Sequence, residues 1–295
     1  MASLLNMSDV AQDTGLSAHV PAHMKRRALL RAPMLAAAVV LSGGYGLPAH
    51  AASGWRLQTR PVHEGLGSPV GMGYDQAGQL YVANWSAGTV LRFSAKGERM
   101  VFASDLNTPS GLAVGPTGDV FVASYNESLV WRFTPAGERS VFASGLAMPA
   151  GLGFDARGRL LIANRRSNQI IAASPGRLQV VAQGLQTPVC AVALPDGRFM
   201  VSNVAGGISV VGADLKPRTV NTDLRSPGPG MVLASRDAVF VADFGSGSVS
   251  RLDVEGRRSV VVDGLSGPAA LAKASDGSLM VATWAENAVF RIRKR

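Results

Sequence analysis

The chain has 295 residues, with 29 Lys and Arg against 20 Asp and Glu, which gives a formal net charge of +9. Its one cysteine, Cys190, excludes an intrachain disulfide. The basic residues are scattered, apart from a short run at 291–295, whereas nucleic-acid binding normally needs a focused basic stripe. We therefore expect no nucleic-acid partner.

The first 51 residues have the organisation of an export signal. A basic segment, Lys25-Arg26-Arg27, precedes an apolar region from Ala32 to Leu47, and Ala49-His50-Ala51 supplies a small-x-small cleavage pattern. We interpret 1–51 as an N-terminal extension with a cleaved signal peptide, which predicts a periplasmic or secreted protein. The start codon is left open between Met1 and Met24.

The export route is left open between two systems. Arg26-Arg27-Ala28-Leu29-Leu30-Arg31 resembles the twin-arginine consensus, but Lys25 stands where Ser or Thr is usual, so Sec export is the alternative. After residue 51 the chain has no apolar run long enough to span a membrane. We expect no membrane span in the mature chain, and a monomer.

Residues 52–295 repeat one unit of about 40 residues. In one copy, four short apolar runs at 109–114, 120–123, 129–133 and 140–143 are separated by Gly, Pro and polar turn residues, which is typical of β-strands. The proline that opens each copy recurs at Pro69, Pro109, Pro149, Pro188, Pro227 and Pro268. Four strands per repeat at this period predict an all-β fold, a six-bladed β-propeller with four-stranded antiparallel blades.

The last repeat lacks a fourth strand. It ends after the run Val289-Phe290-Arg291-Ile292, whereas residues 60–66, ahead of the first repeat, align with the fourth strand of other units. We predict that the N-terminal strand completes the last blade and joins the ends of the ring.

The motifs of the second repeat resemble the NHL repeat. The residues that carry the likeness are Pro-Ser-Gly-Leu-Ala-Val, then Gly-Asp-Val-Phe-Val-Ala-Ser, then Leu-Val-Trp-Arg-Phe, all within 109–137. Related six-bladed families include the SMP-30/gluconolactonase group, virginiamycin B lyase and the strictosidine-synthase-like proteins. The resemblance implies the fold, whereas propellers host many activities.

Two neighbouring positions at the end of each second strand are candidates for a site on the channel face. The first is always polar: Asn84, Ser124, Asn164, Asn203, Asp243 and Thr283. Such residues cap turns by bonding local backbone, which favours a structural role over ligand binding. The second position holds Trp85, Tyr125, Arg165, Val204, Phe244 and Trp284.

The second position predicts an aromatic surface. Blades 5, 6, 1 and 2 are neighbours in the ring, so their four aromatic residues would form one arc, faced by Arg165 from blade 3. Aromatic rings beside a guanidinium suit a small planar or partly anionic ligand. The alternative is that the rings only pack between blades.

The catalytic residues of the resembled families are not matched. Gluconolactonases hold a divalent metal with Glu, Asn and Asp at the channel ends of first strands, whereas the matching positions here are Val70, Ser110, Ala150, Val189, Gly228 and Ala269. Virginiamycin B lyase depends on histidine, and the only histidine after the signal is His63, on the presumed closing strand. We predict no metal site, no cofactor and no catalytic residue.

Other reactive side chains receive structural interpretations. Cys190 matches the small-residue position of Gly111 and Gly151 and is expected in the channel wall. Glu127 and Glu286 are weak candidates for acid or base, because exposed loop carboxylates are usually solvated. Arginines recurring on third strands indicate a structural role: Arg92, Arg132, Arg251 and Arg291.

The function predicted from the sequence is an exported binding module. Its ligand would be a small molecule or a protein on the channel face. The first alternative is a hydrolase or lyase of the SMP-30/gluconolactonase or virginiamycin-lyase type. A second is an interaction scaffold that uses the outer blade edges.

Overall fold

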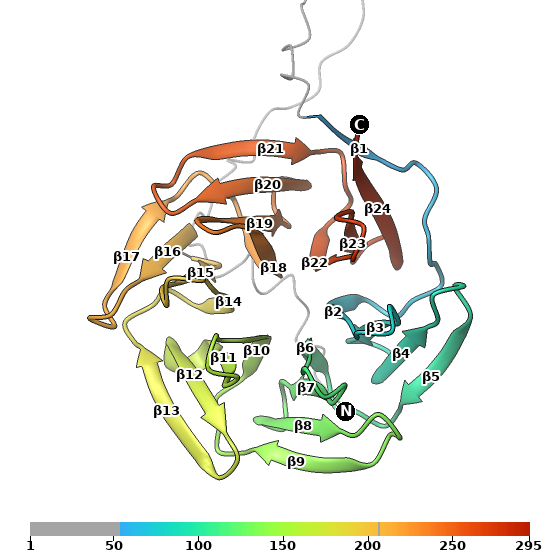
Figure 1. Cartoon of the computed structure of the whole chain (residues 1–295), viewed down its shortest axis with the longest axis horizontal. Helices are drawn as coiled ribbons and strands as arrows, with labels where there is room; N and C mark the ends of the chain where they lie inside the picture. Colours follow the sequence, from blue (N-terminus) through green and yellow to red (C-terminus); the bar gives the residue numbers. More distant parts are fainter. Residues whose placement is uncertain (1–53, 206) are drawn as a thin grey trace, which may run out of the picture. The chain divides into compact units, whose positions relative to one another are not determined.

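The computed structural model describes residues 54–205 and 207–295, which form six four-stranded antiparallel sheets (Figure 1). The sheets are the blades of a β-propeller, as the repeats predict. The predicted export segment, 1–51, lies outside the described residues. Within the described part the only helical element is the 3-10 turn Arg165–Ser167, so no helix there is long and apolar enough to cross a membrane.

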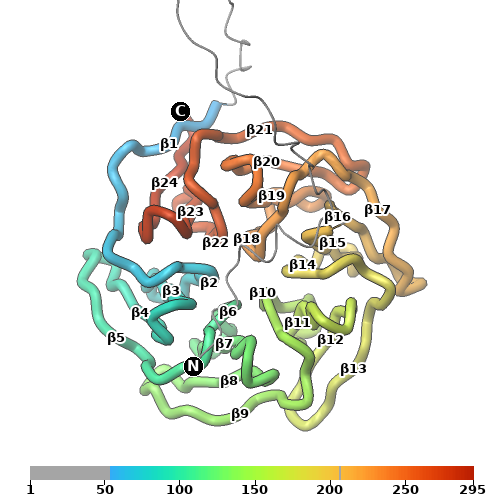
Figure 2. The backbone as a smooth tube through the Cα atoms, turned by 180° about the vertical axis from the view of Figure 1, so that it is seen from behind, coloured from blue at the N-terminus to red at the C-terminus, as the bar shows by residue number. Residues whose placement is uncertain are grey.

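The first strand of each blade lies nearest the centre of the ring and begins at the repeated proline (Figures 1 and 2). These strands are β2 (Pro69–Tyr74), β6 (Pro109–Val114), β10 (Pro149–Phe154), β14 (Pro188–Ala193), β18 (Pro227–Ser235) and β22 (Pro268–Lys273). The second strands are buried along their whole length, which explains why they are almost continuously apolar. They are β3 (Leu80–Asn84), β7 (Val120–Ser124), β11 (Leu160–Asn164), β15 (Phe199–Asn203), β19 (Ala238–Asp243) and β23 (Leu279–Thr283).

Third and fourth strands form the outer half of each blade. The third strands are β4 (Thr89–Phe93), β8 (Leu129–Phe133), β12 (Gln169–Ser174), β16 (Gly207–Val211), β20 (Ser248–Asp253) and β24 (Ala288–Lys294). The fourth strands are β5 (Arg99–Ala103), β9 (Arg139–Ala143), β13 (Arg177–Ala182), β17 (Pro217–Asn221), β21 (Arg258–Val262) and, for the sixth blade, β1 (Trp55–Leu57).

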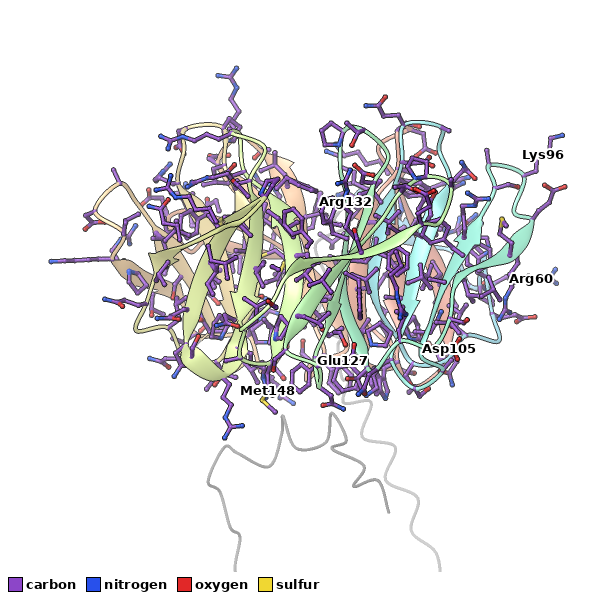
Figure 3. All side chains as sticks on the ribbon, turned by 90° about the horizontal axis from the view of Figure 1, so that it is seen from below. Arg60, Lys96, Asp105, Glu127, Arg132 and Met148 are labelled. Carbon is purple, nitrogen blue, oxygen red and sulfur yellow. The ribbon has the colours of Figure 1, made fainter. Side chains whose placement is uncertain are left out.

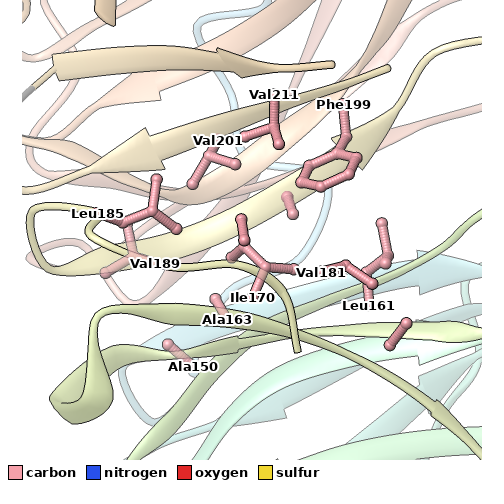
Figure 4. Close-up of a cluster of buried hydrophobic side chains, with 13 residues drawn as sticks. Ala150, Leu161, Ala163, Ile170, Val181, Leu185, Val189, Phe199, Val201 and Val211 are labelled. Atoms are coloured by element: carbon pink, nitrogen blue, oxygen red, sulfur yellow. The ribbon is translucent and has the colours of Figure 1, made fainter. Parts of the chain in front are cut away.

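The hydrophobic core lies between the blades. The buried apolar side chains fall into six clusters, each shared by two neighbouring blades. Figure 4 shows the cluster between the third and fourth blades, in which Ile170 and Val181 face Val189 and Phe199. A blade therefore buries its two faces only against its neighbours, so the ring has to close.

Closure is made by the N-terminal strand, as predicted, but with a different register. β1 pairs with β24 through Trp55–Lys294, Arg56–Arg293 and Leu57–Ile292, whereas the residues aligned from the sequence began at Arg60. The alignment holds only at its end, where His63 bridges Val289 and the Leu66 N–H donates to Asn287. Pro61 lacks an N–H and interrupts the ladder, so 58–62 form a strap that is bonded to β24 only at its ends, where the N–H groups of Gln58 and Val62 donate to the carbonyls of Arg291 and Val289 at 2.8 and 2.7 Å.

The first strands approach one another closely at the centre of the ring. A Cβ atom at Gly111 would collide with the carbonyl oxygen of Ala150, and one at Gly151 with that of Val189. A bulge directly after Pro69 and Pro109 shifts the register at the start of the first strand. Glycine at these positions therefore permits the tight inner wall.

Candidate ligand-binding face

The loops that enter the first strands and the turns between second and third strands lie on one face, here called the entry face. Figure 3 shows Asp105 and Met148, from two entry loops, along the same edge as Glu127, from a turn after a second strand. Lys96, from a turn between third and fourth strands, lies toward the opposite edge. The entry face is therefore the one on which both candidate positions end.

The polar position at the end of each second strand is buried, and in most blades it bonds the entry loop. Asn84 Oδ1 accepts from the backbone N–H of Gly67 at 3.2 Å, and Asn164 Oδ1 accepts from that of Ala147 at 2.7 Å. Asn203 Oδ1 accepts from Gln186 N–H at 3.3 Å, again with a partner 17 residues earlier. Ser124 Oγ instead donates to the Asn107 carbonyl, and Thr283 Oγ1 donates to the Ala288 carbonyl outside the entry loop.

Asp243 makes the strongest version of this contact. Its carboxylate accepts from the backbone N–H groups of Arg225 and Ser226 at 3.0 and 2.8 Å, and from Ser246 Oγ at 2.6 Å. The side chain is fully buried. Because the amides and the carboxylate are already joined to loop backbone, their geometry supports a role in shaping the face.

The residue that follows the polar position makes the same backbone hydrogen bond in all six blades. The N–H groups of Trp85, Tyr125 and Trp284 donate to the entry-loop carbonyls of Ser68, Thr108 and Gly267. The N–H groups of Arg165, Val204 and Phe244 do the same in the other blades. This hydrogen bond is thus common to the ring, although the turn that follows is a 3-10 turn in blade 3 and is one residue shorter in blade 4.

Three aromatic side chains at this position form a continuous surface, the aromatic arc (Trp284, Trp85 and Tyr125). The ring centroids of Trp284 and Trp85 lie 6.2 Å apart, and those of Trp85 and Tyr125 lie 5.1 Å apart. The ring planes are tilted by 56° and 58°. Trp85 and Trp284 are partly exposed, whereas Tyr125 is buried. The arc was predicted across blades 5, 6, 1 and 2, and the rings of blades 6, 1 and 2 lie next to one another in this way.

Arg165 extends the arc into the third blade. Its guanidinium carbon lies 5.9 Å from the Tyr125 ring centroid, and Nη1 donates to the Tyr125 hydroxyl. Its Nε is buried and has no hydrogen-bond partner among the described residues. Because this atom has no accessible surface, and the Nε of Arg291 is in the same state, a ligand could reach only the exposed part of the half-buried Arg165 side chain.

Phe244 and Val204 contribute differently from the arc. The Phe244 ring packs on the backbone of Gly267, because a Cβ atom there would lie 2.9 Å from its Cε2. Val204 packs against the core cluster between blades 3 and 4. Phe244 therefore contacts the loop that enters the sixth blade at Gly267, whose carbonyl accepts a hydrogen bond from the Trp284 N–H.

The other candidate reactive groups are engaged in packing or local bonds. Glu127 Oε2 accepts from Ser124 Oγ at 2.6 Å and from Trp131 Nε1 at 3.1 Å, a pairing that the sequence reasoning missed. Glu286 is exposed. Cys190 is buried, and this burial raises the pKa of its thiol to about 12. A thiol with that pKa is protonated and a poor nucleophile.

His63 lies in the seam between the first and last blades. Its ring stacks on Phe93 with centroids 3.8 Å apart. Burial, together with the charges of Arg291 and Arg99, lowers its pKa from the ordinary 6.5 to about 4. The imidazole is therefore neutral at pH 7 and serves as a packing residue.

Two of the third-strand arginines have aspartate partners within their own blades, whereas Arg291 has a buried Nε without a hydrogen-bond partner among the described residues and interacts with Tyr74 of the first blade. Arg132 pairs with Asp119 at 3.0 Å, and Arg251 lies 3.9 Å from Asp237. Burial opposes ionisation of Asp119, but hydrogen bonds from Thr117 and Arg132 hold its pKa below the usual value. These contacts support the structural interpretation of the repeated arginines.

The first strands enclose a cavity of about 380 Å³ in the middle of the ring. Its lining comes from all six blades and is apolar, with Met72, Leu112, Phe154 and Met231 among the larger side chains. Within residues 54–205 and 207–295, no three His, Cys, Asp or Glu side chains are grouped so that they could hold a metal ion.

The arrangement of the blades defines the class as a six-bladed β-propeller. No protein-family model and no curated protein matches the sequence. Among solved structures, the chain is similar to a gluconolactonase of Xanthomonas campestris, with a TM-score of 0.69 and 14% identity over 80% of this chain and 89% of that one.

Two lyase structures show the same similarity. A streptogramin B lyase structure gives a TM-score of 0.65 with 11% identity, over 82% of this chain and 98% of the other. The virginiamycin B lyase of Staphylococcus aureus gives 0.62 with 12% identity, over 80% and 88%. At these identities the likeness shows the propeller fold alone, which is the fold that the repeat resemblance implied.

Proposed function

We propose that the protein is a binding module whose ligand sits on the entry face against the aromatic arc and Arg165. The observation that carries this proposal is the continuous contact from Trp284 through Trp85 and Tyr125 to the half-buried Arg165 side chain. These four residues occupy one position in four blades that share the same backbone hydrogen bond there. Their chemistry is therefore not required by the repeat.

The arrangement suits a planar ligand group that carries an anion. The tilted indole rings offer apolar faces, and the guanidinium offers directed donors to a carboxylate or similar oxyanion. A small molecule or an exposed aromatic-acidic segment of a protein would both present this chemistry. Four buried polar side chains would hold the entry loops in place through hydrogen bonds to loop backbone: Asn84, Asn164, Asn203 and Asp243.

Tryptophan fluorescence tests this proposal directly. A panel of planar aromatic carboxylates, with their uncharged amides, would be titrated into the purified protein. We expect quenching by a carboxylate, lost in Trp85→Ala and weakened about tenfold or more in Arg165→Gln, because a charge-assisted hydrogen bond is worth roughly 1.5–3 kcal/mol. The matched control is Trp131→Phe, since Trp131 lies on the third strand and is bound to Glu127.

Two results would contradict the proposal. If Trp131→Phe loses the fluorescence quenching to the same extent, the quenching does not come from the aromatic arc. Binding of a partner that survives both Trp85→Ala and Trp284→Ala would favour the outer-edge scaffold.

A hydrolase or lyase is the second candidate, favoured by the shared fold with a gluconolactonase and two lyases. Metal analysis of protein purified without chelator or histidine tag separates the two functions. One tightly held divalent ion per chain would indicate ligation by Asn84, Asn164, Asn203 and Asp243 and favour the hydrolase. Hydrolysis of a sugar lactone, lost in Asp243→Asn, would support it further.

We also propose that the protein is exported, by the twin-arginine or the Sec route. The support is the basic segment, apolar region and Ala49-His50-Ala51 pattern. N-terminal sequencing of the exported protein should give a mature chain that starts at Ala52. Replacement of Arg26 and Arg27 by Lys should block export by the twin-arginine route and leave Sec export intact.

A further inference from the structure

The seam that closes the ring carries a like-charge pair that the fold does not require. In the β1–β24 ladder, Arg56 lies directly opposite Arg293. Directly opposed residues of an antiparallel pair project to the same face with Cβ atoms about 5 Å apart, where like charges are destabilising. Both arginines are exposed, so neither is needed to fill the core.

The two arginines belong to a basic hollow on the outside of the ring. The hollow has a volume of about 820 Å³ and is lined by β1, the strap 58–62 and the end of β24. Five of its lining residues are cationic and none is acidic: Arg56, Arg60, Arg293, Lys294 and Arg295. Arg56 and Arg293 share one face of the strand pair, whereas the Lys294 side chain lies over Trp55 on the other face. Figure 3 shows Arg60 at the outer edge of the molecule.

The cations of the hollow form no ion pair with an aspartate or glutamate within 4 Å among residues 54–205 and 207–295. The acidic group that they influence is Asp276, whose pKa is lowered mainly by hydrogen bonds from Ser278 and further by the charges of Arg291 and Arg293. Lys294 instead lies 5.4 Å from the ring centroid of Trp55. The neighbouring polar side chains, Gln58 and Thr59, add further donors to the same lining.

We infer that the basic hollow binds phosphate groups, either of a soluble polyphosphorylated molecule or of a lipid headgroup. A bound phosphate between Arg56 and Arg293 would convert their repulsion into two charge-assisted contacts, and guanidinium groups match phosphate oxygens in geometry. Polynucleotide binding is less well supported, because Trp55 packs edge-on against Phe240 and does not offer a ring for base stacking. The site is separate from the entry face.

The test uses tripolyphosphate as the soluble probe and calorimetric titration of the purified protein at low salt. We expect saturable binding with one site per chain, weakened at least about tenfold in the double variant Arg56→Gln/Arg293→Gln. The matched control is Arg177→Gln/Arg218→Gln, which removes the same charge from two exposed fourth-strand positions of other blades. The control should bind as the wild type does.

Thermal unfolding gives a second measurement of phosphate binding, which remains usable if the double variant has altered stability. Without probe, the variant should melt about 1–3 °C above the wild type, since a like-charge pair is removed. The probe should then stabilise the wild type and the control but not the variant. Arg60→Gln, in the strap outside the ladder, gives a second binding measurement that leaves the strand pair intact.

Sedimentation with vesicles identifies the source of the phosphate. Binding to phosphatidylglycerol-containing vesicles, absent with pure phosphatidylcholine and lost in the double variant, would assign a lipid headgroup. Tripolyphosphate binding without vesicle binding would assign a soluble ligand. Equal weakening in variant and control, no binding to either probe, or tighter seam-dependent binding of a DNA oligonucleotide would overturn the inference.

Discussion

The entry face and the seam break the regularity of the propeller in different ways. On the entry face all six blades keep the same backbone hydrogen bond to the entry loop, and most of the variation lies in side chains such as Trp85 and Arg165. At the seam the backbone itself departs from the repeat, because β1 comes from the other end of the chain. Residues at positions that are alike in every blade stabilise the fold. Residues at positions where one blade differs are available to bind a ligand or to close the ring.

Removal of the closing segment, 55–64, breaks the seam and should have the largest effect. Trp55 and Leu57 pack on the cluster between blades 5 and 6, and burial of each large apolar side chain contributes about 1.5–3 kcal/mol. We expect the melting temperature to fall by about 10 °C or more. Calorimetry measures this change. A melting temperature within about 2 °C of that of the wild type would contradict the role of β1 in closing the ring.

Replacement of a shared polar position should be the next most damaging change. Asp243→Ala leaves the entry-loop N–H groups of Arg225 and Ser226 without their acceptor, the fully buried carboxylate. We expect a loss of about 2–3 kcal/mol in the free energy of unfolding, measured by urea denaturation. Asp243→Asn, which keeps one acceptor oxygen, should lose less. An unchanged stability in Asp243→Ala would show that the loop contact is dispensable.

The stability of the seam should depend on pH through His63. Its pKa is about 4 in the folded protein and about 6.5 in the unfolded chain, so the unfolded state binds the proton first as the pH falls. The stabilisation is complete above pH 6.5 and is lost progressively between pH 6.5 and 4. Denaturation curves of the wild type and His63→Phe should diverge over this window, with the variant less sensitive to pH. Parallel curves would contradict this role.

Cys190 gives the smallest expected effect. Because its thiol is buried with a pKa of about 12, native protein at pH 8 should react with a thiol reagent far more slowly than urea-unfolded protein. The entry-face variants should leave this reaction unchanged. Rapid labelling of the native protein would indicate that the inner wall opens.

The regular part of the fold followed from the sequence because each blade repeats the same local signals. The recurring proline, the buried second strand and the Gly-containing turns fix the strands of every blade, and β6 and β8 have the predicted bounds. The alignment of the closing strand was less accurate. It was correct at His63 and Leu66, but the strap 58–62, which contains Pro61, interrupts the pairing, and the regular ladder with the free edge of β24 resumes at 55–57.

The candidate site was predictable in its residues but not in its contacts. Neighbouring blades placed Trp284, Trp85 and Tyr125 in order, and the structure brings their rings together. Phe244 instead packs on Gly267, and Glu127 binds Trp131, neither of which has a signal in the repeat.

The sequence by itself determined the number of blades, the strand order and the residues at each repeated position, because these depend on local turn chemistry and on a period of about 40 residues. Only the tertiary structure decided which side chains from different blades meet. It set the bond between Arg165 and Tyr125, and it placed Arg56 opposite Arg293. Those contacts join residues far apart in the chain, and they arise from packing the ring closed.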